Sequence, residues 1–332
     1  MTHPASSSVA SNAARGRRLA ARPSLFHRIL KWVLHVLTRA CELQRLLSAL
    51  PVQAQPPSDV VARVELSLMW SRVLPDLSLP VSQHQSFDVP RAVHYVKAQK
   101  HIQEPADSPF TAQLRRCLEM ISDLGTLFER VTELQDTPYD SSQESNEAQL
   151  VELWELMMPE QQLSARVSND WKTLGFQGRD PATDFRGMGM LGLKQLLFFA
   201  QQHNTQARGA LTVSCHPERG FSYAIVGINL SSMAVEFLDN PKLHELLYHL
   251  SNQPECSKDS LVNFNDFYCF LFCEFSRLWR QVNPENMLAF NQIRDSLKAT
   301  VTRTLEHNLE AVSAAIVAMR VLNHDANSSI QH

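Results

Sequence analysis

Glycine is scarce in this chain: 10 of the 332 residues are glycine, or about 3%, against a usual value of about 7%. This scarcity argues against glycine-rich β architectures, collagen-like repeats and flexible linkers. Five of the ten glycines nevertheless lie within the 18 residues from Gly175 to Gly192. This concentration marks the segment as a candidate functional site.

Features that define several other protein classes are absent as well. The six cysteines form no C-x-x-C pair and are too sparse for a disulfide scaffold, which favours a reducing, cytosolic compartment. No run of 18 uncharged apolar residues exists, so no membrane-spanning helix is expected. The 13 histidines lack metal-ligand spacing, and no P-loop, H-E-x-x-H or G-x-S-x-G motif is present. We therefore expect no metal, no cofactor and no self-contained catalytic site.

Acidic side chains are missing from residues 1–41, which carry seven basic ones. Because the chain has 31 basic and 34 acidic side chains in total, residues 42–332 hold 24 basic and 34 acidic ones, a net charge of −10. An acidic body without a basic patch argues against nucleic acid as a partner. The chain thus has a basic head on an acidic body.

Residues 24–39 follow the pattern of an amphipathic helix with a basic polar face. Such a helix is typical of the interface of an anionic membrane. The pattern also fits a helix docked on the protein's own body, and the Arg- and Ser-rich surroundings fit a mitochondrial targeting segment. The sequence leaves these three interpretations open. The side chains expected to face a membrane are Phe26, Ile29, Leu30, Val33 and Leu37.

Helical periodicity dominates the rest of the chain, and asparagine–glycine or aspartate–glycine hairpin signals are absent. We therefore predict an all-α fold. Eight of the 17 prolines fall in residues 51–110, which makes this region a poor candidate for long helices. The expected helices span residues 24–39, 108–135, 145–158, 160–174, 190–203, 222–238, 241–250, 259–282 and 284–320, with a short helix after Asp88.

The polar segment Asp136–Gln143 is expected to separate domains. We predict four regions in chain order: a disordered basic head with the amphipathic helix, an N-terminal region with linkers and a long helix, an all-α domain, and a C-terminal helix end and tail. Their expected bounds are residues 1–50, 51–142, 143–308 and 309–332.

The glycine-rich segment contains Gly187-x-Gly189-x-x-Gly192, which matches a dinucleotide-binding fingerprint. No strand is expected before it, and no acidic residue follows about 20 positions later, so we reject this interpretation. Arg186 stands in a turn-rich loop before an apolar helix. Asp180 and Asp184 are near enough in sequence to hold its guanidinium, so from chemistry alone Arg186 either ties the loop down or acts on a partner.

Trp171, the residues from Gly175 to Gln177 and most residues from Asp180 to Gly189 form one pattern. This pattern resembles the GTPase-activating motif of the ELMO-domain-containing proteins, the ELMOD family. The likeness extends over residues 145–300 and includes Gly220–Leu230 and Phe267–Phe275. The segment Cys41–Arg45 is similar to the N-terminus of the family's types 1 and 2, and the short connection around His216 favours type 2. The motif residues are Trp171, Gly175, Phe176, Gln177, Asp180, Pro181, Thr183, Asp184, Phe185, Arg186, Gly187 and Gly189.

This resemblance implies a helical ELMO domain that accelerates GTP hydrolysis on Arf and Arf-like small GTPases. Arg186 falls on the family's proposed catalytic arginine, while GTP and Mg²⁺ are held by the partner GTPase. Engulfment-type relatives lack this arginine and act as scaffolds with a Rac exchange factor, which leaves a scaffold or GTPase-binding adaptor as the alternative. Arg179 stands where an acidic residue is expected. The expected location is cytoplasmic and peripheral on internal membranes, with mitochondrial association as the alternative.

Overall fold

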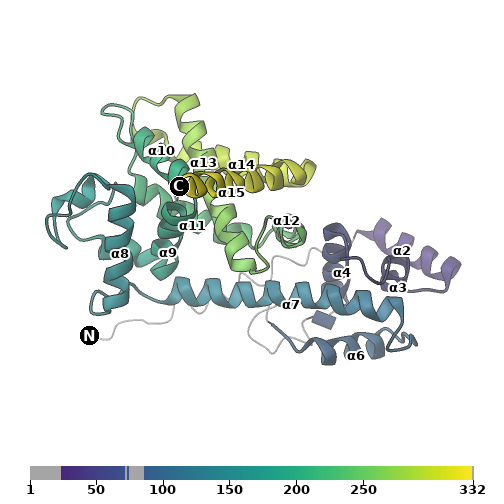
Figure 1. Cartoon of the computed structure of the whole chain (residues 1–332). Coiled ribbons are helices and arrows are strands. Elements are labelled where there is room, and N and C mark those ends of the chain that lie inside the picture. The colour runs from purple at the N-terminus through teal and green to yellow at the C-terminus, as the bar shows by residue number, and fades with distance from the viewer. Residues whose placement is uncertain (1–23, 72, 75–85, 331–332) are drawn as a thin grey trace, which may run out of the picture. The chain divides into compact units, whose positions relative to one another are not determined.

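The computed structural model describes residues 24–71, 73, 74 and 86–330 (Figure 1). Within these residues the secondary structure is helical and contains no strand, so the predicted all-α fold class is confirmed. Residues 1–23, which belong to the head expected to be disordered, lie outside the described residues, and so does most of the segment 75–90 of the region expected to contain linkers. Clustering of contacts divides the chain into two compact units.

Unit 1 comprises the chain up to Glu129 together with Leu238–Gln253, so a short segment from the second half of the sequence belongs to it. In this unit α12 packs on α4, and α3 also packs on α4. Its helices are α2 (Leu25–Thr38), α3 (Glu42–Leu47), α4 (Ser58–Trp70), α6 (Val89–Gln99), the greater part of α7 (Pro109–Asp136) and α12 (Pro241–Asn252).

Unit 2 comprises Arg130–Phe237 and the chain from Pro254 onward. Its centre is formed by α9, α11 and α13, each of which packs on the other two. Besides the end of α7 it contains α8 (Glu144–Met157), the 3₁₀ helices η1 (Asn169–Lys172) and η2 (Pro181–Gly187), α9 (Gly189–Gln202), α10 (Asn204–Ser214), α11 (Tyr223–Phe237), α13 (Ser260–Val282), η3 (Met287–Ala289), α14 (Phe290–His307) and α15 (Leu309–Ile330).

Helix starts follow the capping signals in the sequence. The Asp88 side chain accepts a hydrogen bond from the Arg91 amide at 2.7 Å, with a proline in the first turn of α6. Asn240 caps α12 through the Lys242 amide at 2.9 Å in the same way. These side chains satisfy amide groups that have no partner within their own helix. The short helix after Asp88 and the helix from Pro241 are therefore confirmed.

Three expectations about helices are wrong. Residues 160–174 form turns and the short η1 instead of a helix, and the expected helix over 284–320 is split into η3, α14 and α15. Asn308 marks the break, where its backbone φ of −153° leaves the helical region. The proline-rich region also contains the 13-residue α4, because prolines flank residues 58–70 without entering them.

The amphipathic helix expected over residues 24–39 is observed as α2. Phe26, Ile29 and Leu37 are exposed, Val33 is half-buried, and Leu30 lines a pocket together with residues of α3 and α4. Among the described helices, none is long and apolar enough to cross a bilayer. All six cysteines are free thiols.

Candidate functional site

The glycine-rich segment follows η1, contains η2 and enters α9 in unit 2. Asp180 starts η2 by accepting a hydrogen bond from the Ala182 amide at 3.0 Å, and Pro181 occupies the first turn. A side-chain acceptor before a proline is the arrangement that favours the start of a helix. The sequence thus places Arg186 in the last turn of a short, capped helix.

Aromatic side chains form a continuous row beneath this segment. The rings of Trp171 and Phe176 meet edge to face with centroids 5.7 Å apart, and Phe176 meets Phe185 in the same way at 5.8 Å. Trp154 of α8 and Tyr139 extend the row at its two ends, each at a centroid distance of 5.4 Å. The three motif aromatics are buried. They anchor the segment by packing.

Two motif glycines permit close approach to the protein's own backbone. Gly175 has a φ of +83°, and a Cβ there would lie 2.2 Å from the Tyr223 amide nitrogen. Gly189 has a φ of +51°, and its Cβ would lie 2.4 Å from the carbonyl oxygens of both Gln135 and Thr137. Gly187 differs, since a Cβ there would meet nothing within 4 Å. Gly189 therefore fits the segment against the end of α7, and Gly187 is the motif glycine with open space around it.

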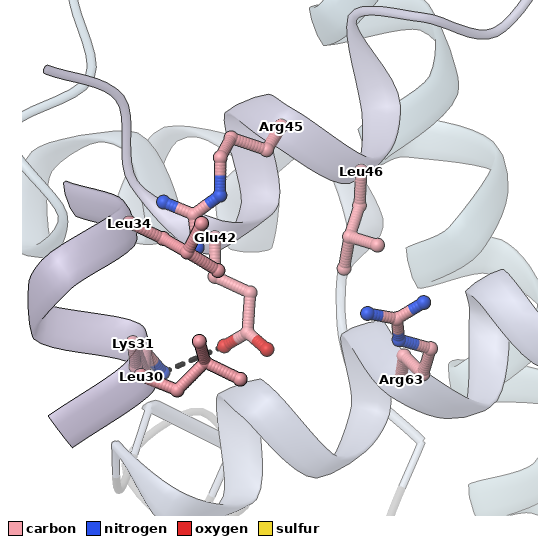
Figure 2. A pocket seen from close by; sticks show the side chains of 7 residues that line it. All are labelled: Leu30, Lys31, Leu34, Glu42, Arg45, Leu46 and Arg63. Carbon is pink, nitrogen blue, oxygen red and sulfur yellow. Dashed lines mark ion pairs between the residues drawn. The ribbon is translucent and has the colours of Figure 1, made fainter. Parts of the chain in front are cut away.

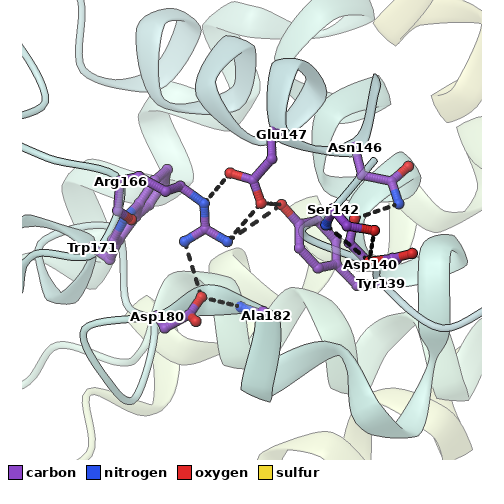
Figure 3. Close-up of polar contacts among 9 residues, drawn as sticks. All are labelled: Tyr139, Asp140, Ser142, Asn146, Glu147, Arg166, Trp171, Asp180 and Ala182. Carbon is purple, nitrogen blue, oxygen red and sulfur yellow. Dashed lines mark hydrogen bonds and ion pairs between the residues drawn. The ribbon is translucent and has the colours of Figure 1, made fainter. Parts of the chain in front are cut away.

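Arg166 lies at the centre of a half-buried polar network (Figure 3). Its Nη1 donates to Asp180 Oδ1 at 2.9 Å and its Nη2 donates to Glu147 Oε1 at 2.9 Å, while Nε donates to the other Glu147 oxygen. Tyr139 donates its hydroxyl to Glu147 at 2.7 Å. Trp171 donates its indole N–H to the Arg166 carbonyl at 2.8 Å. The network joins α8, the loop before η1 and the residue that caps η2.

The charges in this network shift the ionisation of its members. Burial alone would raise the pKa of Glu147, but hydrogen bonds from Arg166 and Tyr139 and the guanidinium charge hold it below its usual value. Burial and the adjacent Glu147 carboxylate raise the pKa of Tyr139. Glu147 is thus held as a carboxylate and Tyr139 as a neutral hydrogen-bond donor. Paired charges of this kind fix geometry more than they add stability.

Sequence reasoning missed Arg166, Glu147 and Tyr139. Arg166 fell inside residues 160–174, which were expected to be helical, and Tyr139 fell inside the expected break between domains. The available signal was an arginine five residues before a motif tryptophan, but a single arginine is too common to indicate a buried network.

Arg186 itself is exposed, and its Nε donates to the Thr183 carbonyl at 2.8 Å. The prediction that Asp180 and Asp184 bind the Arg186 guanidinium is wrong. Asp180 binds Arg166 instead, and Asp184 accepts a hydrogen bond from the Gln177 amide at 2.9 Å. Burial raises the pKa of Asp184, although the Gln177 amide and the Arg186 charge oppose this. Asp184 braces the loop, and its influence on Arg186 is through charge.

The motif residues therefore divide into two groups in the described structure. Buried members hold the segment together, and exposed members form its outer surface beside Arg179. The buried or half-buried residues are Trp171, Gly175, Phe176, Asp180, Pro181, Asp184, Phe185 and Gly189; the exposed ones are Gln177, Thr183, Arg186 and Gly187.

The described residues contain no group of three or more histidine, cysteine, aspartate or glutamate side chains placed to hold a metal ion. The arrangement instead offers one exposed guanidinium on a short helix, supported by an ion-pair network and a row of buried rings. Such a surface can present positive charge to a phosphate held elsewhere.

Comparison with known proteins assigns this arrangement to a family. The model described as the ELMO/CED-12 family matches residues 129–294. ELMO domain-containing protein 2 of Bos taurus is 39% identical over 268 residues, covering 80% of this chain and 87% of that protein. ELMO domain-containing protein 2 of Homo sapiens is 38% identical over the same shares of both chains.

A more distant relative covers more of the sequence. ELMO domain-containing protein B of Dictyostelium discoideum is 32% identical over 286 residues, covering 85% of this chain and 95% of that protein. No solved structure matches the chain. Together with the motif, these similarities show that the chain belongs to the ELMO domain-containing protein family.

Proposed function

We propose that this protein is a GTPase-activating protein for Arf and Arf-like small GTPases, and that Arg186 is the arginine it supplies to the partner's active site. The observation that carries the proposal is an exposed arginine on a capped, braced 3₁₀ helix within the segment that the family model matches. Arg186 would be the catalytic residue, and the other motif residues would bind the GTPase or hold the segment.

The chemistry required of Arg186 follows from the charge that develops during phosphoryl transfer. Negative charge on the transferred phosphoryl group is stabilised by an inserted guanidinium, which accelerates hydrolysis by about 10³–10⁵-fold. A guanidinium can contact two oxygens at once with its planar set of donors, which a lysine ammonium cannot do. The partner GTPase would hold GTP and Mg²⁺, so this chain would need no cofactor of its own.

The side-chain contacts of Arg186 support this role. Its Nε donates to the Thr183 carbonyl and orients the side chain, whereas its two terminal nitrogens contact no acceptor among the described residues. Thr183 belongs to the same short helix, so this contact leaves the guanidinium on the outer surface. A guanidinium held at one nitrogen keeps two donating groups for phosphate oxygens.

The network around Arg166 supports the same role by fixing the helix that carries Arg186. Asp180 is both the cap of η2 and a ligand of Arg166, so the start of η2 is tied to α8 through Glu147. At the other end Phe185 is packed between Tyr139 and Phe176. A rigid support lowers the cost of ordering the catalytic group when the complex forms.

The test is single-turnover GTP hydrolysis by purified Arf and Arf-like GTPases with the wild-type protein and with Arg186→Ala and Arg186→Lys. We expect both variants to lose at least about 10³-fold in stimulation, because neither provides two coplanar donors. Arg208→Ala is the matched control, since Arg208 is an exposed arginine on α10 outside the motif. It should keep full stimulation.

Other outcomes would favour the alternative functions. Equal stimulation by the wild-type protein and both Arg186 variants would contradict the arginine-finger proposal. Stable binding of a GTPase without acceleration would indicate a GTPase-binding adaptor. Copurification with a Rac exchange factor, without any effect on Arf-type GTPases, would indicate a scaffold in membrane traffic or in engulfment and cytoskeletal signalling.

A further inference from the structure

Helix α2 exposes its apolar face. On a wheel of 100° per residue, the apolar side chains that are more than half exposed fall within an arc of about 140°. We call these six residues the apolar arc. They are Leu25 (70% exposed), Phe26 (75%), Ile29 (52%), Trp32 (66%), Val36 (56%) and Leu37 (74%).

The opposite side of α2 contacts the rest of unit 1. Lys31 forms an ion pair with Glu42 of α3 at 2.6 Å, and Glu42 also accepts from Ser67 of α4 at 2.9 Å. Leu30 and Leu34 face a pocket of about 160 Å³ that is also lined by α3 and α4 (Figure 2). The side of α2 that contacts unit 1 thus contains both polar and apolar side chains, while the apolar arc points to solvent. An ordinary docked helix instead buries its apolar face and exposes its polar one.

The charge around the apolar arc indicates what covers it. Arg28 of α2 and Arg39, the residue after its end, are exposed, and residues 1–41 as a whole carry seven basic side chains and no acidic one. An exposed apolar face next to basic side chains fits the acyl–headgroup boundary of an anionic lipid bilayer. The 14 residues of α2 extend about 21 Å, which is too short to cross the hydrocarbon core.

We propose that α2 lies in the surface of an anionic lipid membrane, with the apolar arc inserted among the lipid chains and the basic side chains at the headgroups. The Lys31–Glu42 ion pair then fixes the side of unit 1 that faces the membrane, because it sets the rotation of α2 about its own axis. This proposal is independent of Arg186, since GTP hydrolysis in solution needs no membrane.

The first test is co-sedimentation of the full-length protein with vesicles. Vesicles of phosphatidylcholine with about a third phosphatidylserine should bind at least tenfold more tightly than pure phosphatidylcholine, because each basic residue near an anionic surface contributes about fivefold. Raising the salt concentration should weaken the binding by screening these charges. Equal binding to both vesicle types, or no binding to either, would overturn the proposal.

Trp32 provides a direct report on insertion. Trp154, Trp171 and Trp279 are at most 2% exposed, so their emission should change little when vesicles are added. Emission from Trp32 should shift to shorter wavelength and be quenched by brominated lipid chains. Trp32→Phe should lose the shift while retaining most of the binding. An unchanged spectrum in the presence of bound vesicles would place the apolar arc outside the bilayer.

Variants separate insertion from other uses of the arc. The double variant Ile29→Glu with Val36→Glu places two acidic groups on the arc and should bind anionic vesicles at least tenfold more weakly. Both positions are exposed, so its thermal unfolding midpoint should match the wild type. Leu288→Glu is the matched control, because Leu288 is 90% exposed in η3, and it should bind normally.

Three results would contradict membrane insertion, and two of them would assign the arc or α2 to another role. Vesicle binding unchanged in the double variant would overturn insertion. A wild-type dimer that the double variant loses, without vesicle binding by either, would assign the arc to self-association. Import into mitochondria with a shortened N-terminus would assign α2 to targeting.

Discussion

At the scale of single residues, the motif glycines serve different purposes although they stand close together in sequence. Gly189 lies against the carbonyl oxygens at the end of α7, while Gly187 lies beside Arg186 with open space around its Cα. Glycine lacks a Cβ, so either position allows another backbone to approach closely. Of the two, only Gly187 has open space for the backbone of another protein, because the contact of Gly189 is internal.

Substitution of these two glycines by alanine should therefore separate folding from activity. Gly189→Ala should lower the free energy of unfolding by about 1–3 kcal/mol or more, because it combines a positive φ with a backbone clash. Gly187→Ala should change it by less than about 0.5 kcal/mol. Urea unfolding of both variants measures the difference.

The activity of Gly187→Ala then tests the surface around Arg186. If a GTPase approaches this surface closely, the variant should stimulate hydrolysis less than the wild type while unfolding at the same urea concentration. Similar stability losses in both variants would contradict the distinction drawn between the two glycines.

At the scale of elements, α4 and α12 are joined by a buried ionic contact. His244 of α12 faces Glu65 of α4 through Nδ1 at 3.0 Å and the Leu238 carbonyl through Nε2 at 2.8 Å. Tyr248 donates its hydroxyl to the other oxygen of Glu65 at 3.1 Å. Both ring nitrogens of His244 face acceptors, which favours the doubly protonated, positively charged ring.

This contact predicts a pH dependence of stability. Burial alone would lower the pKa of His244, but the Glu65 charge, the two hydrogen bonds and Asp239 raise it above its ordinary value of about 6.5. The stabilisation is complete below that ordinary pKa and is lost as the pH rises through the raised one. The free energy of unfolding should therefore fall as the pH rises above about 6.5.

Urea unfolding of His244→Asn checks this dependence. At pH 6 the variant should lose about 3 kcal/mol, because the buried Glu65 carboxylate loses the imidazole ring that pairs with it. The loss relative to the wild type should be smaller at pH 9. His94→Asn, at an exposed histidine of α6, is the control and should follow the wild type at both pH values. A constant difference between His244→Asn and wild type would contradict the charge assigned to the ring.

The sequence predicted most helices because apolar residues at three- and four-residue spacing indicate a buried helical face. The same rule failed for residues 160–174, where Leu163, Val167 and Trp171 happen to repeat at helical spacing. The structure there is set by side chains that bind backbone carbonyls, such as Trp154 with Gln161 and Trp171 with Arg166. Contacts of this kind leave no periodic pattern in the sequence.

The candidate site was predictable in part. The motif pointed to the segment and to Arg186, but the partners of Asp180 and Asp184 were assigned by nearness in sequence. Asp180 instead binds Arg166, 14 residues away, and Asp184 binds a backbone amide seven residues away. Nearness in sequence could not reveal these contacts because they depend on how the loop turns.

At the scale of the whole molecule, the two compact units do not correspond to two continuous pieces of chain. The chain leaves unit 2 after Phe237, forms α12 within unit 1 and returns to unit 2 at Pro254. α12 buries one face against α4. The buried residues of α12 are Leu243, His244, Leu246, Leu247, Tyr248 and Leu250.

Truncation should reveal that α12 depends on α4 to cover its apolar side chains. A fragment of residues 130–332 retains α12 but lacks α4, so it should bind the apolar dye ANS, aggregate or unfold at a lower temperature. A fragment of residues 41–332 retains α3, α4 and α12 and should unfold near the temperature of the full chain. Equal unfolding temperatures of the two fragments, without dye binding, would contradict the prediction.

The path of the chain through α12 also has an evolutionary consequence. A domain that moves between genes must include the helices that cover the apolar faces of its other helices. The segment that matches the family model, residues 129–294, contains α12 but not α4. A relative that discarded the region before residue 129 would have to provide another cover for α12, so recombination is expected to transfer the two regions together.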